Sequence, residues 1–152
     1  MPASRRFERT LGNDFKEAAE ARVWLADCLQ SLPVDARGIV SDLVLVLGEL
    51  LTNSVRHAYD PEAPGRIDIV LSVGDEDVLL TVRDYGRPMD PSKRHEPDLS
   101  QANEGGYGLY LVRMLTDDLE IDAPGGVGNR VVVRRGIPAT AGARPAPGPR
   151  SA

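Results

Sequence analysis

The sequence predicts an α+β fold: a two-layer sandwich with helices on one face of a mixed, mostly antiparallel sheet. Apolar residues recur at helical spacing before residue 58 and after residue 108, whereas between residues 66 and 84 they alternate with polar ones. A chain of 152 residues, 41% of them hydrophobic, can bury one sizeable core. We therefore expect one domain over residues 1–136. Residues 137–152 are mostly Ala, Pro and Gly, and we expect a disordered tail there.

Two helices are predicted after a short edge strand at residues 5–10. Asn13 or Asp14 can cap the first helix, which we expect to continue to about Leu32. The second helix is expected to start near Val34 or Asp35 and to extend to Ala58. We place two aromatic side chains of the first helix and one of the helix after residue 108 in the core: Phe15, Trp24 and Tyr110. The second helix has a broad apolar face: Leu43, Leu47, Leu50, Leu51 and Ala58.

Four strands complete the prediction. Residues 66–73 and 78–84 alternate apolar and polar side chains on either side of a turn at 74–77, which indicates an antiparallel hairpin. The last two strands are expected at 119–123 and 130–135.

Glu49 and Asn53 lie one helical turn apart on the second helix, so their side chains meet, with Arg56 beside them. One interpretation is the solvated face of an amphipathic helix. The other is a functional pair, because a carboxylate and a carboxamide oxygen on a rigid element can hold Mg²⁺ and orient a nucleophile.

Asp84 continues the apolar face of its strand to the edge of the core, and Gly86 follows two residues later. A carboxylate in that position is costly unless a donor satisfies it. It could be a solvated strand-end aspartate, or an acceptor in a pocket for a ligand N–H.

Residues 85–104 show little periodicity and lead into Gly105, Gly106 and Gly108, after which an apolar helix is predicted. Such long irregular segments often form binding loops. Glycines that open a helix leave backbone N–H groups available for a phosphate, although flexible loops also end this way. The pattern is neither a P-loop nor a dinucleotide-binding fingerprint.

Composition excludes some partners. The formal net charge of −5 argues against nucleic acid or an anionic membrane as a direct partner. We find no apolar segment long enough to cross a bilayer and no hydrophobic centre of a signal peptide in residues 1–13. The single cysteine, Cys28, cannot form an internal disulfide. We therefore expect a cytoplasmic protein.

Three motifs occur in an order that resembles a known family. Glu49-x-x-x-Asn53, Asp84-x-Gly86 and the glycines Gly105, Gly106 and Gly108 resemble the three boxes of the GHKL ATPases, which share the Bergerat fold and include histidine kinases and gyrase. The segments ELLTNSVRHAY and EGGYGLYLV look most like the small anti-sigma-factor serine kinases of bacteria. The resemblance covers about residues 5–135.

The resemblance implies a role for each matching residue. Asn53 would be the Mg²⁺ ligand and Glu49 the general base. Asp84 would accept the adenine amino group of ATP, and Gly86 would let the backbone approach the base. Gly105, Gly106 and Gly108 would contact the phosphates, helped by Lys93 or Arg94. In the family a Gly-Thr pair often enters the last strand. Here Gly128-Asn129 occupies that position, so the adenine contact would be altered or made by Asn129.

The resemblance also implies partners. The leading hypothesis is an ATP-dependent serine/threonine kinase that binds a sigma factor and phosphorylates an anti-sigma-factor antagonist, with a homodimer possible. The alternative is a non-catalytic ATP-binding regulator that acts through protein–protein binding. A plain interaction domain would not bind ATP at all. Retention of Glu49 favours the kinase, because a pure binding module has no need of a base.

Overall fold

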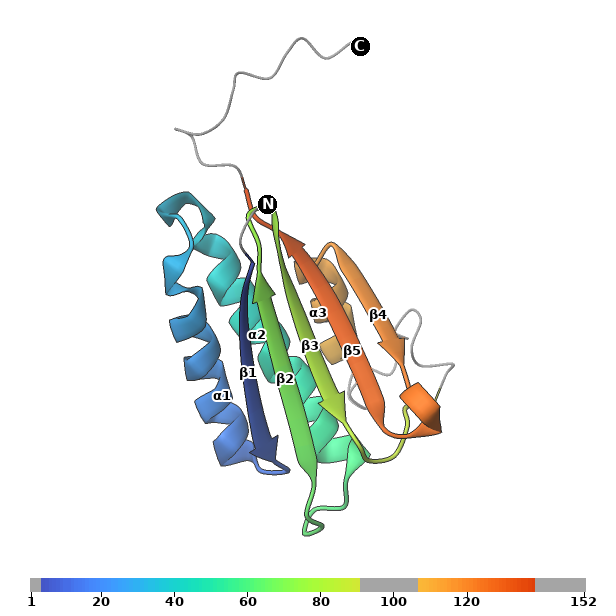
Figure 1. Cartoon of the computed structure of the whole chain (residues 1–152). Coiled ribbons are helices and arrows are strands. Elements are labelled where there is room, and N and C mark those ends of the chain that lie inside the picture. The colour runs from blue at the N-terminus through green and yellow to red at the C-terminus, as the bar shows by residue number, and fades with distance from the viewer. Residues whose placement is uncertain (1–3, 91–106, 139–152) are drawn as a thin grey trace, which may run out of the picture.

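Five strands form one sheet, and three α-helices pack against one of its faces (Figure 1). The protein is seen here as a computed structural model that describes residues 4–90 and 107–138. These elements confirm the predicted α+β two-layer sandwich. The strands are β1 (Arg5–Gly12), β2 (Arg66–Val73), β3 (Asp77–Asp84), β4 (Asp118–Asp122) and β5 (Asn129–Gly136). The helices are α1 (Phe15–Cys28), α2 (Gly38–Asn53) and α3 (Tyr107–Leu115).

The sheet has the strand order β1-β2-β3-β5-β4, and every pairing within it is antiparallel. The prediction of a mixed sheet was wrong in this respect. The chain crosses from β3 through α3 to β4, a connection that makes β3 and β4 point the same way. They do not pair, because β5 returns between them and bonds to both.

Helix α1 begins as predicted, with Asp14 as its cap: the Asp14 carboxylate accepts a hydrogen bond of 2.7 Å from the Lys16 backbone N–H. The α-helix ends at Cys28, and a 3₁₀ turn (Leu29–Ser31) completes the segment. The start predicted for the second helix is instead a separate 3₁₀ turn (Val34–Ala36), and α2 begins at Gly38.

We predicted that the second helix would extend to Ala58. Its regular α-helical part instead ends at Asn53. After Asn53 the chain forms a π-helical turn, Ser54–Ala58, in which Ser54 and Val55 are buried. A π turn shifts the direction of the side chains that follow it, and such turns are frequent at functional sites. Ser54, the first residue of this turn, lies against the end of β3 and donates to Asp84.

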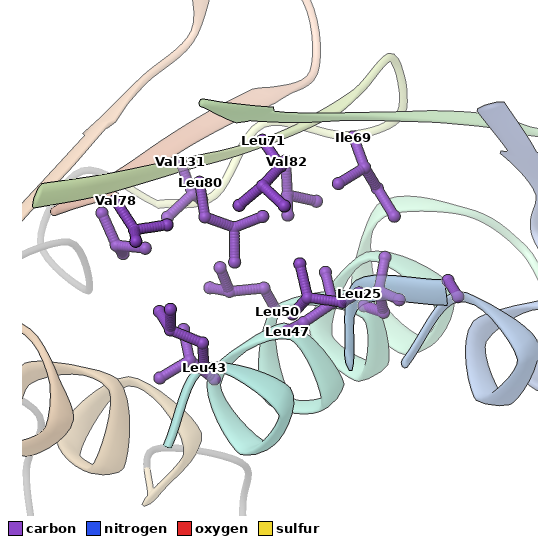
Figure 2. Close-up of a cluster of buried hydrophobic side chains, with 14 of the residues drawn as sticks. Leu25, Leu43, Leu47, Leu50, Ile69, Leu71, Val78, Leu80, Val82 and Val131 are labelled. Carbon is purple, nitrogen blue, oxygen red and sulfur yellow. The ribbon is translucent and has the colours of Figure 1, made fainter. Parts of the chain in front are cut away.

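The core lies between α2 and the inner face of the sheet. Leucines of α2 face apolar side chains of β2 and β3, and α1 contributes Leu25 (Figure 2). The predicted apolar face of α2 is confirmed, since each of its members is at most 3% exposed: Leu43, Leu47, Leu50, Leu51 and Ala58. Burial of these side chains contributes roughly 1.5–3 kcal/mol per leucine to folding.

Phe15 is not a core residue, contrary to the prediction. It is 53% exposed, because it is the first residue of α1 and its side chain lies at the helix surface. The Arg56 guanidinium lies 5.9 Å from the centre of its ring. Trp24 and Cys28 are half-buried and pack against the core.

One segment of the described chain, Gly38–Ala58, could cross a membrane by length and composition alone, with a mean hydropathy of 1.5 over its most apolar window. The expectation that the sequence contains no such segment was wrong. The segment is the central helix of the core, however, and its leucines pack against the sheet (Figure 2). Core helices pass the same test, so this is weak evidence for a membrane span.

Residue Ile137, the first of the predicted tail, packs against the core, and its N–H donates to the Glu76 carbonyl at 2.8 Å. The rest of the tail, from residue 139 onward, lies outside the described residues, so its disorder stays a prediction.

Candidate functional site

Glu49 and Asn53 are half-buried on the exposed side of α2, one turn apart as predicted. The start of α3 lies directly against them. A Cβ atom placed on Gly108 would be 2.9 Å from Glu49 Oε2 and 3.7 Å from the amide atoms of Asn53. Among residues 4–90 and 107–138 neither side chain has a hydrogen bond or an ion pair.

The amino end of α3 faces the same place, since Gly108 is its second residue. The first N–H groups of a helix have no partner within the helix, and its dipole favours a negative charge there. An anion close to Glu49 and Asn53 would therefore be stabilised by α3. The other predicted phosphate-contacting residues lie outside the described residues: Lys93, Arg94, Gly105 and Gly106.

Asp84 is the buried carboxylate of the site, with 2% of the residue exposed. Its Oδ1 accepts hydrogen bonds from the Asn129 backbone N–H at 3.0 Å and from the Gly86 N–H at 3.3 Å. Its Oδ2 accepts one from the Ser54 hydroxyl at 2.9 Å. A carboxylate offers about four lone-pair sites. Asp84 thus accepts hydrogen bonds from three parts of the chain.

Ser54 is a site residue that the sequence analysis missed. It belongs to the π turn and connects the helix of Glu49 and Asn53 to the carboxylate of Asp84 through a bond of 2.9 Å. Ser54 follows Leu47 and Leu50 at helical spacing, so the period of α2 places it on the face toward the sheet. The sequence analysis took that face as purely apolar and therefore did not consider which group a serine on it would bond.

Gly86 and Gly128 allow three backbone segments to approach one another beside Asp84. A Cβ on Gly86 would overlap the Ala58 carbonyl, to which the Arg87 N–H donates at 2.7 Å. A Cβ on Gly128, whose φ is +61°, would overlap the Asp84 carbonyl. Only glycine fits at either position. The predicted close approach at Gly86 is therefore one of backbone to backbone within the described chain.

Asn129 opens β5 directly opposite Asp84 in the sheet register. Its Nδ2 lies 3.1 Å from Asp84 Oδ1 and 3.3 Å from Oδ2, and also donates to the Arg87 carbonyl at 3.0 Å. Its Oδ1 accepts from the Met89 N–H at 2.6 Å. Asn129 thus lies in the site as predicted, but its side chain is occupied by the protein. Direct contact with a cofactor stays a prediction.

A second polar cluster, centred on Asp68, lies on the outer face of the sheet beside the end of β3. Asp68 accepts from Thr10 at 2.8 Å, from Arg66 at 2.8 Å and from the Tyr85 hydroxyl at 2.6 Å. Burial alone would raise the pKa of Asp68, but these hydrogen bonds outweigh it and lower that pKa. The hydrogen bond to Asp68 raises the pKa of Tyr85. The residue after Asp84 is therefore fixed in place.

We expect Tyr85→Phe to lower the free energy of unfolding by roughly 0.5–1 kcal/mol at neutral pH, because Tyr85 is exposed and water competes for its bond. Folding lowers the pKa of Asp68 below its ordinary value near 3.9. The hydrogen bonds to the ionised carboxylate therefore stabilise the fold fully above that pH, and their contribution is lost as the pH falls through the lowered pKa. The stability difference between the two proteins should shrink toward about pH 3. Urea unfolding at several pH values measures it, with Asp68→Asn as the partner in a double-mutant cycle. A difference independent of pH would contradict the assigned bond.

The hollow that the described residues leave elsewhere, about 830 Å³, does not include this site. It opens beside β4 and the outer face of the sheet, where Val70, Thr81 and Val132 form part of its lining.

Chemically, the candidate site combines oxygen ligands on α2, a helix amino end, and a buried acceptor at Asp84. That set suits a ligand with a hydrogen-bonding ring at one end and anionic groups at the other.

Comparison with known proteins identifies the class. Residues 12–135 match the model of the histidine kinase-like ATPase domain. The chain therefore belongs to the histidine kinase-like ATPase domain family, as the motifs indicated.

Among curated proteins, the chain is similar to the serine-protein kinase RsbW of Oceanobacillus iheyensis, with 30% identity over 96 residues, covering 58% of this chain and 61% of that protein. It is also similar to the anti-sigma F factor of Clostridium beijerinckii, with 26% identity over 103 residues, covering 63% of this chain and 70% of the relative. The chain thus spans about three fifths of the length of the RsbW proteins it matches.

Solved structures share the fold. The histidine kinase domain from the blue-light activated histidine kinase of Erythrobacter litoralis EL346 superposes with a TM-score of 0.54 at 24% identity, covering 79% of this chain and 61% of that one. The mycobacterial sensor histidine kinase MprB superposes with a TM-score of 0.53 at 16% identity, covering 88% and 100%. At these identities the likeness establishes the fold alone.

Proposed function

We propose that this chain binds ATP with Mg²⁺ and is a serine/threonine protein kinase of the anti-sigma-factor type. One observation carries the proposal: Glu49 and Asn53, free of partners within the described ranges, lie against Gly108 at the amino end of α3. The similarity to proteins named serine-protein kinase RsbW and anti-sigma F factor supports the same conclusion. Phosphoryl transfer requires mainly positioning and charge neutralisation, and this arrangement suits both.

The residues present fit a nucleotide and a magnesium ion. Asn53 offers a hard carboxamide oxygen, the kind of ligand that Mg²⁺ accepts alongside water and phosphate oxygens. The missing side chain at Gly108 leaves space beside Glu49 that a Cβ would fill. When bound, Mg²⁺ would neutralise negative charge on the phosphates. The N–H groups at the start of α3 would add to that neutralisation.

Glu49 is the proposed general base. Its Oε atoms would accept the proton of a substrate serine or threonine hydroxyl as the oxygen becomes a nucleophile. The carboxylate lies on a rigid helix, close to the backbone of Gly108. Such positioning is what a base on a phosphoryl-transfer enzyme must have.

Asp84 is the proposed acceptor for the amino group of adenine. The Ser54 hydroxyl and the Asn129 N–H both donate to it, so its oxygens act as acceptors in the site. A nucleobase that presents an amino group to this carboxylate gains a hydrogen bond, whereas a nucleobase that presents a carbonyl oxygen is repelled. The site would thus favour adenine over guanine.

The proposed partners are a sigma factor and an anti-sigma-factor antagonist in the cytoplasm, the antagonist being the phosphorylated substrate. Among the described elements, all three α-helices lie on one face of the sheet, and the other face is uncovered (Figure 1). Leu79 on that face is 39% exposed. An uncovered face of this kind is available to another protein or to a second copy of the chain. The homodimer stays a prediction.

A non-catalytic ATP-binding regulator is the second candidate. The hydrogen bonding of Asp84 is common to both candidates, because the proposed base-binding half of the site contains no catalytic residue. The two candidates differ only in Glu49, which a regulator could lose without consequence. Transfer of phosphate to a serine or threonine of the antagonist decides between them.

We expect the purified protein to bind ATP only in the presence of Mg²⁺, and Asn53→Ala to weaken this binding about tenfold or more, because the carboxamide ligand is lost. Isothermal titration calorimetry with and without EDTA measures it. Thr52→Ala, one residue away on the same helix, is the matched control and should bind as the unaltered protein does. If millimolar ATP gave no Mg²⁺-dependent heat, the chain would be a protein-binding domain instead.

A further inference from the structure

Helix α3 lies alongside α2 in the opposite direction and contacts it at both ends. At its amino end, a Cβ on Gly108 would come within 2.9 Å of Glu49 Oε2. At its carboxyl end, the Arg135 guanidinium donates to the Leu115 carbonyl at 2.5 Å and lies 2.8 Å from the Asp42 carboxylate of α2. Glu49 follows Asp42 by seven residues, a rise of about 10 Å. Leu115 follows Gly108 by the same number, so the two contacts are equally far apart on both helices.

Arg135 reaches this place from the inner face of β5. It continues the alternation of Val131 and Val133, which are 7% and 0% exposed. Its own side chain is only 25% exposed, and a charged group with so little access to water needs partners. The Asp42 carboxylate and the Leu115 carbonyl supply them. One guanidinium therefore joins β5, α2 and the end of α3.

The carboxyl end of a helix suits a positive charge. Its last carbonyls have no partner within the helix, and its dipole is negative there. The Thr116 hydroxyl donates to the Val112 carbonyl at 2.6 Å, but this bond lies within the end of α3 itself. Asp117, two residues beyond α3, is bonded to the end of β5 and fixes where the chain leaves the helix. Arg135 bonds the helix itself and connects it to α2.

We propose that Arg135 is a positioning residue for the phosphate end of the site: held by Asp42, it fixes α3 lengthwise along α2 and so sets the place of Gly108 relative to Glu49. The inference rests on the proposed ATP-binding function. A shift of α3 by one residue would move its amino end about 1.5 Å along α2. Because an N–H···O bond tolerates only about 2.7–3.2 Å between its heavy atoms, such a shift would break a bond to a phosphate.

The test compares two ligands by calorimetry in the full chain with Mg²⁺: ATP, and adenosine, which has the same base and sugar but no phosphate. Arg135→Met keeps the apolar stem and removes the guanidinium. We expect its affinity for ATP to fall about tenfold, because bonds to the charged phosphates are lost, while its affinity for adenosine stays within about twofold. A general loosening of the fold would lower both affinities together.

Arg135→Lys is the conservative variant that should restore the function. Both bonds of Arg135 come from the same nitrogen, Nη1, so a single ammonium nitrogen can replace it. We expect its affinity for ATP to lie within about threefold of that of the unaltered protein. If Arg135→Met did not fold, Asp42→Asn would serve in its place, because it removes the charge that holds the guanidinium. The affinity of that variant for ATP should fall about threefold, again without a matching loss for adenosine.

Arg134→Met is the matched control. Arg134 precedes Arg135 on the same strand but lies on the outer face of the sheet, where it pairs with Asp118 at 2.7 Å and Asp77 at 3.9 Å. Its replacement removes comparable ion pairs without touching α3 or α2. Both affinities should therefore equal those of the unaltered protein.

The outcomes separate this inference from the proposed function. Equal losses for ATP and adenosine in Arg135→Met, unchanged binding of ATP, or no recovery in Arg135→Lys would overturn the inference while ATP binding stood. If the unaltered protein bound adenosine as tightly as ATP, the phosphate end would contribute nothing and the inference would also be overturned. If it bound neither, the proposed function would fail, and the inference with it.

Discussion

Glu49→Gln should lower the rate of phosphate transfer to the antagonist about a hundredfold or more, while Mg²⁺-dependent ATP binding stays within about threefold of the unaltered protein. The amide has the size of the carboxylate and fits beside Gly108, where a Cβ would come within 2.9 Å of Glu49 Oε2. It cannot accept a proton from a serine hydroxyl at neutral pH. Binding and transfer should therefore separate in this one variant.

Single-turnover transfer from radiolabelled ATP, together with calorimetry, measures both quantities. Glu120→Gln, the same change on the outer face of the sheet, is the control and should alter neither. Unchanged transfer by Glu49→Gln would refute the assignment of the base. Equal loss of binding and transfer would instead place Glu49 among the groups that hold the nucleotide.

Asp84→Asn should weaken ATP binding roughly 10- to 100-fold, the range expected when a hydrogen bond to a charged group is lost. The fold should survive, because the amide oxygen can replace Oδ1 as acceptor for the Asn129 N–H and the Ser54 hydroxyl can rotate to accept. The new N–H₂ group repels an amino group and attracts a carbonyl oxygen. GTP should therefore gain affinity relative to ATP.

Calorimetry with both nucleotides and thermal unfolding of each variant measure this result. Asp68→Asn is a matched control: it changes a hydrogen-bonded aspartate of the neighbouring strand that faces away from the core. It should cost stability without changing the preference between nucleotides. ATP binding that survived Asp84→Asn unaltered would remove Asp84 from the site.

The parts of the fold that the sequence predicted correctly are those with a strong period. The leucine face of α2 and the β2–β3 hairpin repeat every turn or every second residue, so their burial followed from spacing alone. The strand order could not be predicted in this way, because the position of β5 between β3 and β4 depends on contacts between residues far apart in the chain. The exposure of Phe15 was not predictable either, because it depends on how the first turn of α1 lies relative to the rest of the fold.

The site was predictable at the level of motifs and not of contacts. The order of Glu49, Asn53, Asp84 and Gly108 indicated the family, and the structure brings Gly108 against the α2 pair. Ser54 was missed because the apolar period marks its face as buried but does not say which polar partner, here Asp84, a serine on that face would have. That the amide of Asn129 is occupied by backbone groups of Arg87 and Met89 could only be seen in three dimensions.

The hydrogen bonds around Asp84 hold the base end of the proposed site in place before a ligand binds. Under the proposed function, a nucleoside-sized inhibitor would bind this end without the entropic cost of ordering it. Such a compound would meet a carboxylate whose position is set by Asn129 and Ser54.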